Sequence, residues 1–494
     1  MLLKSLIKDI PEVACKGDPG INIRGLSHDS RTVLPGDLFV ALRGARTDGN
    51  RYLSQAIERG AVALASEENL EPKEAVAVLT VRDARRFLAE AALIFYGDPA
   101  AHFKLVAITG TNGKTTTAYL LHSIFRQAGL RSCLAGTLGL YIGEQRSSSA
   151  YTTPEAPELF GFLRQALDGG CTHGALEASS HALAGKRVYG AKFAAGVFSN
   201  LSPEHLDFHG DMESYYRAKR LLFDGGGRNQ IDCAVINTDD AYGRRLAAET
   251  RGPMLCYGAG PAAHVRLMVS RKHIDGTDLH IGTPLGDVRL RMRLIGTPNI
   301  YNVLAAVSAA VSLDIPLDSI RGGIESVAGV PGRMELVRAD QPFTLVVDYA
   351  HTPDALEKLL QTIHELPHRR IITVFGCGGD RDPFKRPVMG EIAGRLSAMV
   401  IITSDNPRTE DPQKILAEIE PGTRKTGADC RIVADRRRAI GIAVSAAEAG
   451  DVVVIAGKGH EDYQILGTQS VSFDDRAVAR ELIAQMQTLK GARN

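Results

Sequence analysis

The stretch that decides the fold is FKLVAITGTNGKTTTAYLLHSIFRQAG, residues 103–129. Its apolar beginning, FKLVAIT, predicts a β-strand, and TTTAYLLHSIFRQAG predicts a helix that stops at Gly129. Between them lies the loop GTNGKT, residues 110–115. The backbone N–H groups of such a loop point at phosphate oxygens, and the helix N-terminus adds the positive end of its dipole. We expect Lys114 to bridge the β- and γ-phosphates and the Thr115 hydroxyl to ligate Mg²⁺.

The loop departs from the usual phosphate-loop spacing, because Ile108 stands where the first glycine would be. A tight strand–helix turn without a ligand is therefore the alternative. The loop alone does not separate a ligase from a kinase or a GTPase switch. A GTPase would carry an Asn-Lys-x-Asp guanine reader, and the sequence contains none.

The rest of the chain repeats this alternation of strands and helices. A length of 494 residues suggests about three domains of roughly 150 residues each. We place them at residues 1–102, 103–334 and 335–494. Apolar strands separated by helices predict an α/β protein, with parallel sheets covered on both faces in the central and last domains. Ligands bind at the carboxyl ends of such strands.

Charge and cysteine content exclude several classes of protein. The net charge is +1, from 58 basic and 57 acidic residues, so broad electrostatic capture of nucleic acid or of an anionic membrane is not expected. The seven cysteines are scattered and never spaced CxxC, which favours reduced thiols over disulfides or a zinc site. The first residues form a poor signal peptide, and no apolar stretch approaches the roughly 20 residues of a membrane span. We expect a cytoplasmic protein.

Further motifs point to one family. They are Asp29-Ser30-Arg31, GDLFVA at 36–41, EASSH at 177–181, NLSPEHLD at 200–207, YYRAK at 215–219 and VDYAHTP at 347–353. In this order, and together with GTNGKT, they resemble the Mur ligases, which share a fold with folylpolyglutamate synthetases. The resemblance spans essentially the whole chain. It implies an ATP-dependent ligase in which a carboxylate attacks the γ-phosphate and an amine displaces the resulting acyl phosphate.

The resemblance also implies a catalytic centre with two Mg²⁺ ions, since an anionic carboxylate must approach a triphosphate. Thr115 and Glu177 offer hard oxygen ligands to one ion, and His205 is expected at the second. Lys219 shares a helix face with Tyr215, and partial desolvation would lower its pKa. In Mur ligases the matching lysine is carbamylated by CO₂ and holds the second ion through water. A solvated helix lysine and a hydrogen-bonded structural histidine are the alternatives for Lys219 and His205.

The resemblance also implies ATP-binding residues outside the loop. Asn299 and Asn302 match the segment on the adenine side of ATP, although both could instead cap the helix that follows. Arg333 and His351 are expected to reach ATP from the domain boundary and the last domain. The residues predicted to bind ATP are Gly110, Thr111, Asn112, Gly113, Lys114, Thr115, Thr116, Asn302, Arg333 and His351.

The UDP-sugar substrate is assigned by the same resemblance. Small hydroxyls and an arginine suit a pyrophosphate, a uracil edge and a peptide carboxylate, although each Ser or Thr could be a cap or turn residue. One departure from the family is Gly185, where relatives often have Gln. The residues predicted to bind the UDP-muramoyl dipeptide are Ser30, Thr152, Thr153, Ser179 and Arg187.

The last domain carries the choice of amino acid. The tetrapeptide Asp405-Asn406-Pro407-Arg408 resembles the signature of the diaminopimelate-adding ligases, and lysine-adding relatives differ at the arginine. Diaminopimelate has an ammonium and a carboxylate at its far end, so Arg381 and Arg408 can clamp the carboxylate while Glu461 pairs with the ammonium. A surface ion pair of Arg408 is the alternative. The residues predicted to bind meso-diaminopimelate are Arg381, Asp405, Asn406, Pro407, Arg408, Gly457 and Glu461.

The resemblance thus implies an enzyme that joins meso-diaminopimelate to the D-Glu γ-carboxylate of UDP-MurNAc-L-Ala-D-Glu, and we expect it to be a monomer. Lysine-adding and D-Ala-D-Ala-adding ligases are the nearest alternatives. A nucleotide-binding switch without ligase turnover is the alternative from another class.

Overall fold

The structure, a computed structural model, describes residues 1–44, 47–71, 76–224 and 229–491. It divides into two compact units. The first unit comprises Met1–Leu267, Ile281–Val288 and Asn302–Gly323, and the second comprises Met268–His280, Arg289–Tyr301 and Ile324–Asn494. Within the described ranges, no helix is both long and apolar enough to cross a membrane.

The first sheet has five strands in the order β1-β5-β4-β3-β2, and only the β1–β5 pair is antiparallel. Alternate side chains of its strands face opposite sides: Leu38 and Val40 pack toward α3, whereas Phe39 packs with Ala56 of α2. Helix α2 ends before Gly60, which has a φ of +100°. The elements of this region are α1 (Leu3–Ile7), β1 (Val13–Lys16), β2 (Gly25–Ser27), β3 (Asp37–Val40), η1 (Gly49–Tyr52), α2 (Leu53–Glu58), β4 (Ala63–Ser66), β5 (Ala77–Val81), α3 (Ala84–Phe95) and η2 (Pro99–His102).

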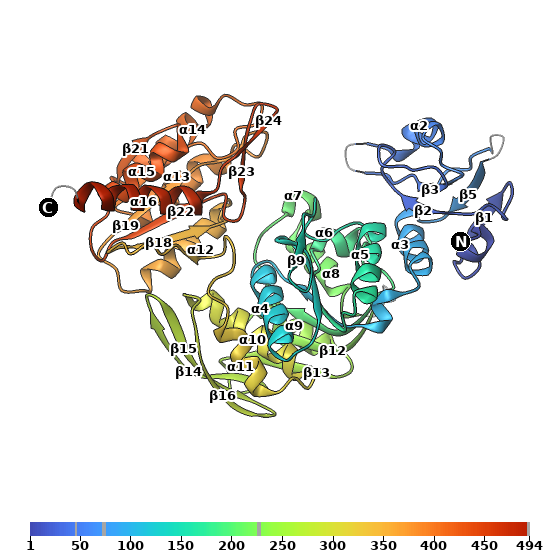
Figure 1. Cartoon of the computed structure of the whole chain (residues 1–494), viewed down its shortest axis with the longest axis horizontal. Helices are drawn as coiled ribbons and strands as arrows, with labels where there is room; N and C mark the ends of the chain where they lie inside the picture. The colour runs from blue at the N-terminus through green and yellow to red at the C-terminus, as the bar shows by residue number, and fades with distance from the viewer. Residues whose placement is uncertain (45–46, 72–75, 225–228, 492–494) are drawn as a thin grey trace. The chain divides into compact units, whose positions relative to one another are not determined.

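The central sheet is built around β6 (Lys104–Thr109) (Figure 1). Strands β13-β12-β11-β6-β10-β7 run parallel in this order, and β8 and β9 continue from β7 as antiparallel strands. The parallel part was predicted, but the antiparallel edge was not, because β8 and β9 are short and mostly half-exposed or exposed. The elements from here to the last region are α4 (Lys114–Gln127), β7 (Ser132–Gly136), β8 (Gly139–Ile142), β9 (Gln145–Ser147), α5 (Ala156–Asp168), β10 (His173–Glu177), α6 (Ser180–Ala184), β11 (Lys192–Phe198), α7 (Leu206–His209), α8 (Met212–Arg220), β12 (Gln230–Asn237), α9 (Ala241–Glu249), β13 (Met254–Gly258), β14 (Val265–His273), β15 (Gly276–Thr283), β16 (Gly286–Met292), α10 (Thr297–Val311) and α11 (Leu317–Glu325).

The last sheet has the strand order β17-β18-β22-β19-β20-β21, parallel except for β17. Val454 of β22 packs on the side of α12, α13 and α14, and its neighbour Val453 packs on the side of α15 and α16. This alternation confirms the predicted sheet with both faces covered. The elements are β17 (Glu335–Leu336), β18 (Thr344–Asp348), α12 (Pro353–His364), β19 (Ile371–Phe375), α13 (Lys385–Leu396), β20 (Met399–Ile402), α14 (Pro412–Arg424), β21 (Asp429–Ile432), α15 (Arg436–Ala446), β22 (Val452–Ala456), β23 (Tyr463–Leu466), β24 (Gln469–Ser472) and α16 (Asp475–Gly491).

Candidate active site

The loop 110–113 connects the carboxyl end of β6 to the first turn of α4, as predicted. Gly110 and Gly113 have φ values of +143° and +90°, a region that favours glycine. A Cβ on Gly110 would stand 2.0 Å from Ser199 Oγ, and one on Gly113 would stand 2.2 Å from Asn302 Oδ1. Both glycines are therefore required by backbone conformation and by close neighbours. Asn302 lies against the loop, although it belongs to the interior of α10 and not to its cap.

The loop is held in place by hydrogen bonds with Ser199 and Asn200, the two residues that follow strand β11. Thr111 N donates to the Asn200 carbonyl at 2.8 Å, and Asn112 N donates to Asn200 Oδ1 at 3.0 Å. Ser199 Oγ donates to the Asn112 carbonyl at 2.6 Å. Ser199 and Asn200 follow β11, which pairs directly with β6. Neither residue was predicted for this role, although the sequence signal exists: both stand directly after an apolar strand.

Two ammonium groups share one acceptor in this loop. Lys114 Nζ and Lys219 Nζ each donate to the Gly110 carbonyl oxygen at 2.8 Å. Lys219 is only 1% exposed, and its ammonium lies 4.5 Å from the centre of the Tyr215 ring. Burial, and then the charge of Lys114, hold the pKa of Lys219 well below its usual value. The partial desolvation predicted for Lys219 is therefore nearly complete, and the alternative of a solvated helix lysine is wrong.

Glu177 ends β10 and lies beside the first turn of α4. Its Oε2 accepts from Thr115 Oγ1 at 2.9 Å, and its Oε1 accepts from Thr137 N at 2.8 Å. Thr137, which follows β7, was not predicted. The side chain of Glu177 is 1% exposed. The structure thus brings together Thr115 and Glu177, two of the four residues predicted to hold metal.

These two oxygen donors fit Mg²⁺, which binds to one or two carboxylates and takes its other ligands from phosphates and water. Among residues 1–44, 47–71, 76–224 and 229–491, no group of three or more His, Cys, Asp and Glu side chains could hold a metal ion. Thr115 and Glu177 by themselves would supply only part of the coordination shell of Mg²⁺. That is the arrangement expected where the metal arrives with a triphosphate.

His205 stands at the start of α7 with a left-handed φ of +56°. Its exposed ring lies 4.7 Å from the ring of His181 and 6.4 Å from that of Tyr215, measured between centroids. Desolvation is the main cause that lowers the pKa of His205, and the charges of Lys114 and Lys219 add to it. A neutral imidazole is the form that binds metal. The ring contacts associate His205 with Tyr215, and so with the helix face that carries Lys219.

The residues predicted for the muropeptide cluster around Thr153. Thr153 Oγ1 donates to the Glu177 carbonyl at 2.6 Å, and Arg187 Nη1 donates to the Thr153 carbonyl at 2.8 Å. Ser179 lies 3.1 Å from Thr153 Oγ1 and also caps α6 by accepting from Ala182 N. Thr152 Oγ1 is 3.1 Å from Thr137 Oγ1, next to Glu177. Four of the five predicted residues therefore lie together beside Glu177, one of the residues predicted to hold metal.

The fifth residue, Ser30, lies in the first region and donates to Gln55 Oε1 at 2.6 Å. Gly185 is the C-cap of α6, and a Cβ there would come within 2.8 Å of the His181 carbonyl. Any side chain at residue 185 would thus require the end of α6 to shift. The predicted gap in the substrate contacts at Gly185 stays a prediction.

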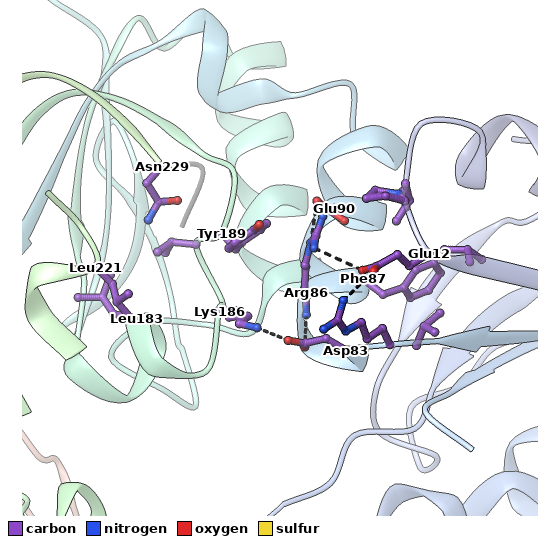
Figure 2. A pocket seen from close by; sticks show the side chains of 16 residues that line it. Glu12, Asp83, Arg86, Phe87, Glu90, Leu183, Lys186, Tyr189, Leu221 and Asn229 are labelled. Atoms are coloured by element: carbon purple, nitrogen blue, oxygen red, sulfur yellow. Dashed lines mark hydrogen bonds and ion pairs between the residues drawn. The ribbon is translucent and has the colours of Figure 1, made fainter. Parts of the chain in front are cut away.

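A cavity of about 500 Å³ lies close to this cluster but takes no part in it (Figure 2). Lys186, next in sequence to Arg187, points to Asp83, the N-cap of α3, and the two form an ion pair. Arg86 pairs with Glu90 and lies above the Tyr189 ring. The cavity is lined by none of the residues predicted to bind ATP or the muropeptide. Its walls join the first sheet region to the central one.

In the second unit, the two residues predicted to reach ATP lie against the ring of Tyr349. The Arg333 guanidinium lies 5.0 Å from the centre of the Tyr349 ring, and the His351 ring lies 4.6 Å from it. The ring of His460 lies 5.1 Å away on the same tyrosine. Burial raises the pKa of Tyr349 to about 12, so its phenol stays neutral. Tyr349 follows β18 directly, and it was not predicted as a site residue.

The loops that follow β20 and β22 also meet. Asn406 Nδ2 donates to Glu461 Oε2 at 2.9 Å, and the position of a Cβ on Gly457 lies 2.4 Å from Asp405 Oδ2. A Cβ on Gly379, after β19, would stand 1.9 Å from the Pro407 carbonyl oxygen, so this third loop reaches the same place.

The two arginines predicted to clamp a carboxylate are placed differently. Arg408 is half-buried with a left-handed φ of +53°, and its Nη1 donates to the Gly379 carbonyl at 2.8 Å. Arg381 is exposed and donates to the Asp380 carbonyl at 3.1 Å. The pKa of Asp380 is lowered most by its hydrogen bonds with Thr409, and the charges of both guanidinium groups lower it further. Their joint clamp on a substrate stays a prediction.

Comparison with known proteins places the chain. Family models match residues 22–96 (Mur ligase family, catalytic domain), 108–310 (Mur ligase middle domain) and 332–459 (Mur ligase, glutamate ligase domain). This chain belongs to the Mur ligase family. The predicted family and the α/β fold of the chain are confirmed.

Relatives of this Mur ligase match along its full length. A protein of Geobacter metallireducens is 46% identical over 99% of this chain and 100% of its own, and one of Listeria monocytogenes is 42% identical over 97% and 98%. Both are named UDP-N-acetylmuramoyl-L-alanyl-D-glutamate–2,6-diaminopimelate ligase. A solved structure with the same name superposes with a TM-score of 0.71 at 34% identity, covering 98% of this chain and 99% of that one. A Mycobacterium tuberculosis folylpolyglutamate synthase shares the fold at a TM-score of 0.61 and 17% identity, covering 75% and 92%.

Proposed function

We propose that this Mur ligase joins meso-diaminopimelate to the D-Glu γ-carboxylate of UDP-MurNAc-L-Ala-D-Glu, with ATP converted to ADP and phosphate. The observation that carries the choice of substrates is the full-length similarity, at 42–46% identity, to relatives that bear the name of this ligase. The Asp405-Asn406-Pro407-Arg408 loop, beside Glu461, supports it from within the chain.

The first step needs a carboxylate to approach a triphosphate. A γ-carboxylate oxygen attacks the γ-phosphorus, the bond between that phosphorus and the β–γ bridging oxygen breaks, and ADP leaves. Lys114 and the N–H groups at the start of α4 would be the local donors for the phosphates, since the N–H groups of Thr111 and Asn112 already donate to Asn200. Mg²⁺ held by Thr115 and Glu177, with a second ion at His205 and Lys219, would neutralise charge on the phosphates.

In the second step the neutral amine of diaminopimelate attacks the acyl carbon, phosphate leaves, and the nitrogen loses a proton. The amine must arrive uncharged, and water must be kept from the acyl phosphate. The last region would deliver the amine, because its predicted amino-acid residues meet at the carboxyl ends of β19, β20 and β22.

Lys219 is proposed to carry a carbamate. Burial, and then the charge of Lys114, lower the pKa of Lys219 well below its usual value, so its amine loses its proton more readily than that of a solvated lysine. The unprotonated amine adds to the carbon of CO₂ with release of one proton. The product is an anion at the place where two ammonium groups now share the Gly110 carbonyl. Such an anion would offset the charge of Lys114 and serve as a metal-organising group.

The test is a phosphate-release assay in which each component is omitted in turn. Turnover is expected only with ATP, Mg²⁺, the UDP-dipeptide and meso-diaminopimelate together. ATP hydrolysis that needs neither co-substrate would indicate an ATPase or a switch. Equal efficiency with lysine would move the assignment to a lysine-adding or unselective ligase.

We also propose that the enzyme works as a monomer in the cytoplasm. Its seven free cysteines are compatible with a reducing compartment. Light scattering coupled to size-exclusion chromatography, with and without substrates, tests the monomer, and a dimer mass would contradict it.

A further inference from the structure

Lys458 is a fully buried lysine beside the loops predicted to bind the amino acid. It follows β22, and its side chain is 0% exposed. Its Nζ lies 3.1 Å from Glu461 Oε2 and 3.2 Å from Asn406 Oδ1, with the Tyr463 ring centre 5.4 Å away. Burying an ammonium is costly unless it is paired, so this contact with Glu461 is part of what holds the loop.

The hydrogen bonds of Asn406 are fixed by this lysine. Asn406 Oδ1 accepts from Lys458 Nζ and from Ile465 N at 2.9 Å, and Asn406 Nδ2 donates to Glu461 Oε2. Lys458, Asn406 and Glu461 thus form a closed triangle, the 458 triangle. It directs two donors at one oxygen of Glu461 and so orients the carboxylate. Two residues predicted to contact the amino acid are therefore positioned by a third residue that was not predicted.

The charges around the 458 triangle balance. Arg436 is fully buried and forms a bidentate ion pair with Asp475 at 2.8 and 2.7 Å, while donating to the Ala456 carbonyl beneath the triangle. Asp405 is buried beside Gly457, and Arg408 lies two residues beyond Asn406. Lys458, Arg408 and Arg436 provide three positive charges, and Glu461, Asp405 and Asp475 provide three negative ones. These six charges sum to zero, and Asp462 and Arg333, whose charges act on the neighbouring Tyr463 and Tyr349, add one charge of each sign.

A buried cluster without net charge discriminates between substrate amino acids by the net charge of their far ends. The far end of meso-diaminopimelate carries an ammonium and a carboxylate, which sum to zero. The far end of lysine carries an ammonium alone. A lone cation can pair only with Glu461, whereas a zwitterionic end can pair both its charges, so the lone cation recovers less of the hydration that it loses.

We propose that Lys458 is a specificity-determining positioning residue: its charge keeps the cluster neutral, so that amino acids with a zwitterionic far end are preferred to amino acids that end in a lone ammonium. The proposal rests on the function proposed above. It differs from a clamp by Arg408 because Lys458 acts through Asn406, Glu461 and the summed charge. Removal of this one positive charge leaves the cluster at −1, which suits a cationic chain end.

The test compares Lys458→Met with the wild type, with meso-diaminopimelate and lysine as alternative substrates. For the variant, KM for meso-diaminopimelate should rise about tenfold or more, and the efficiency with lysine should hold or rise. The ratio of the two kcat/KM values should fall by at least about tenfold, and KM for ATP and the UDP-dipeptide should stay within about twofold. Lys458→Arg should keep most of the preference because it restores the charge. The control is Lys425→Met, which removes an exposed lysine at the end of α14.

Two outcomes would overturn the proposal. One is a loss of efficiency by the same factor with both amino acids, which is the result of a purely structural role. The other is an unchanged ratio. If Lys458→Met does not fold by circular dichroism, Lys458→Gln is measured in its place, and retention of the full preference in that folded, uncharged variant would also overturn the proposal. Failure of the proposed function is distinguished by the wild type, which would then not turn over with meso-diaminopimelate.

Discussion

The phosphate loop and the amino-acid loops of this Mur ligase are held in different ways. Six consecutive residues, 110–115, make the phosphate loop, and its contacts are largely to backbone atoms, such as the Gly110 carbonyl that receives both Lys114 and Lys219. The amino-acid region is made of loops after three separate strands. These loops are held together by hydrogen bonds between side chains that are distant in sequence, such as the bond from Asn406 to Glu461.

This difference separates turnover from choice of substrate. If Lys114 and Lys219 act on ATP as proposed, a change in the phosphate loop affects the reaction with every amino acid. A change in the amino-acid loops alters the charge balance around Glu461 and leaves the phosphate loop untouched. Substitutions in the phosphate loop should reduce the rate with every amino acid. Substitutions in the amino-acid loops should change the ratio of rates between amino acids.

The largest effect is expected from Lys114→Ala. It removes the ammonium that would stabilise the transferring phosphate, and turnover should fall by roughly 1,000-fold or more. Phosphate release measures this, and circular dichroism should show an intact fold. Lys104→Ala, an exposed lysine at the start of β6, serves as the control and should keep its activity. Substantial activity in Lys114→Ala would break the comparison, since the phosphate loop would then not control the rate.

Lys219→Ala should lose activity by roughly 100-fold, because it removes a group proposed to organise metal. Short-chain carboxylic acids should restore part of this activity by replacing the proposed carbamate. Lys192→Ala, a largely exposed lysine in β11, should show neither the loss nor the rescue. A density map of a nucleotide complex that shows a bare amine on Lys219 would contradict the carbamate.

Arg408→Ala should reduce efficiency with meso-diaminopimelate by about 10- to 100-fold, because a buried hydrogen bond to a charged group is worth roughly 1.5–3 kcal/mol. Any residual activity with lysine should change far less. Steady-state kinetics with both amino acids measure this. Arg424→Ala, at the end of α14, removes an exposed arginine paired with Glu420 and is the matched control. An equal loss with both amino acids would mean that Arg408 supports the loop rather than the choice.

The fourth prediction concerns stability and pH in Lys219→Met. The folded-state pKa of Lys219 is lowered, so the unfolded chain binds more protons in the range between that pKa and about 10.4. The wild type therefore loses stability as pH falls through this range. In CO₂-stripped buffer, Lys219→Met should melt at a higher temperature than the wild type at pH 7, and the gap should shrink toward pH 10. A gap that grows with pH would contradict the lowered pKa.

The smallest effect is expected from Ser179→Ala. It removes the N-cap of α6 and should cost about 1 kcal/mol of folding free energy, with a rise of a few-fold in KM for the UDP-dipeptide. Ser179→Asp keeps a capping oxygen and should recover the stability. If KM recovers together with stability in Ser179→Asp, Ser179 acts through the cap and does not contact the substrate.

The sequence predicted the fold of the nucleotide region well because its signals are local. The strand, the loop and the helix of residues 103–129 lie side by side in the chain, and Gly129, with a φ of +73°, ends the helix region as expected. The same holds for Glu177, which ends an apolar strand. The antiparallel strands β8 and β9 were missed because they have little buried apolar surface to produce an alternating pattern.

The contacts between motifs could not be predicted from spacing. Thr137 is 40 residues from Glu177, and nothing in its sequence neighbourhood marks it as a partner of a carboxylate. Lys458 is 52 residues from Asn406. Each contact depends on strand order, which places the ends of distant strands next to one another. The roles predicted for individual side chains stay predictions, since the structure supplies their neighbours and not their ligands.

The glycines of the phosphate loop limit how this enzyme could escape an inhibitor. A side chain at Gly113 would collide with Asn302, and one at Gly110 would collide with Ser199. A single nucleotide change at either codon thus damages the enzyme before it can exclude a drug. Resistance through Gly110 or Gly113 would need a second change, at Ser199 or Asn302, to make room for the new side chain. A compound anchored to the backbone of this loop therefore faces a target with few viable single-step mutants.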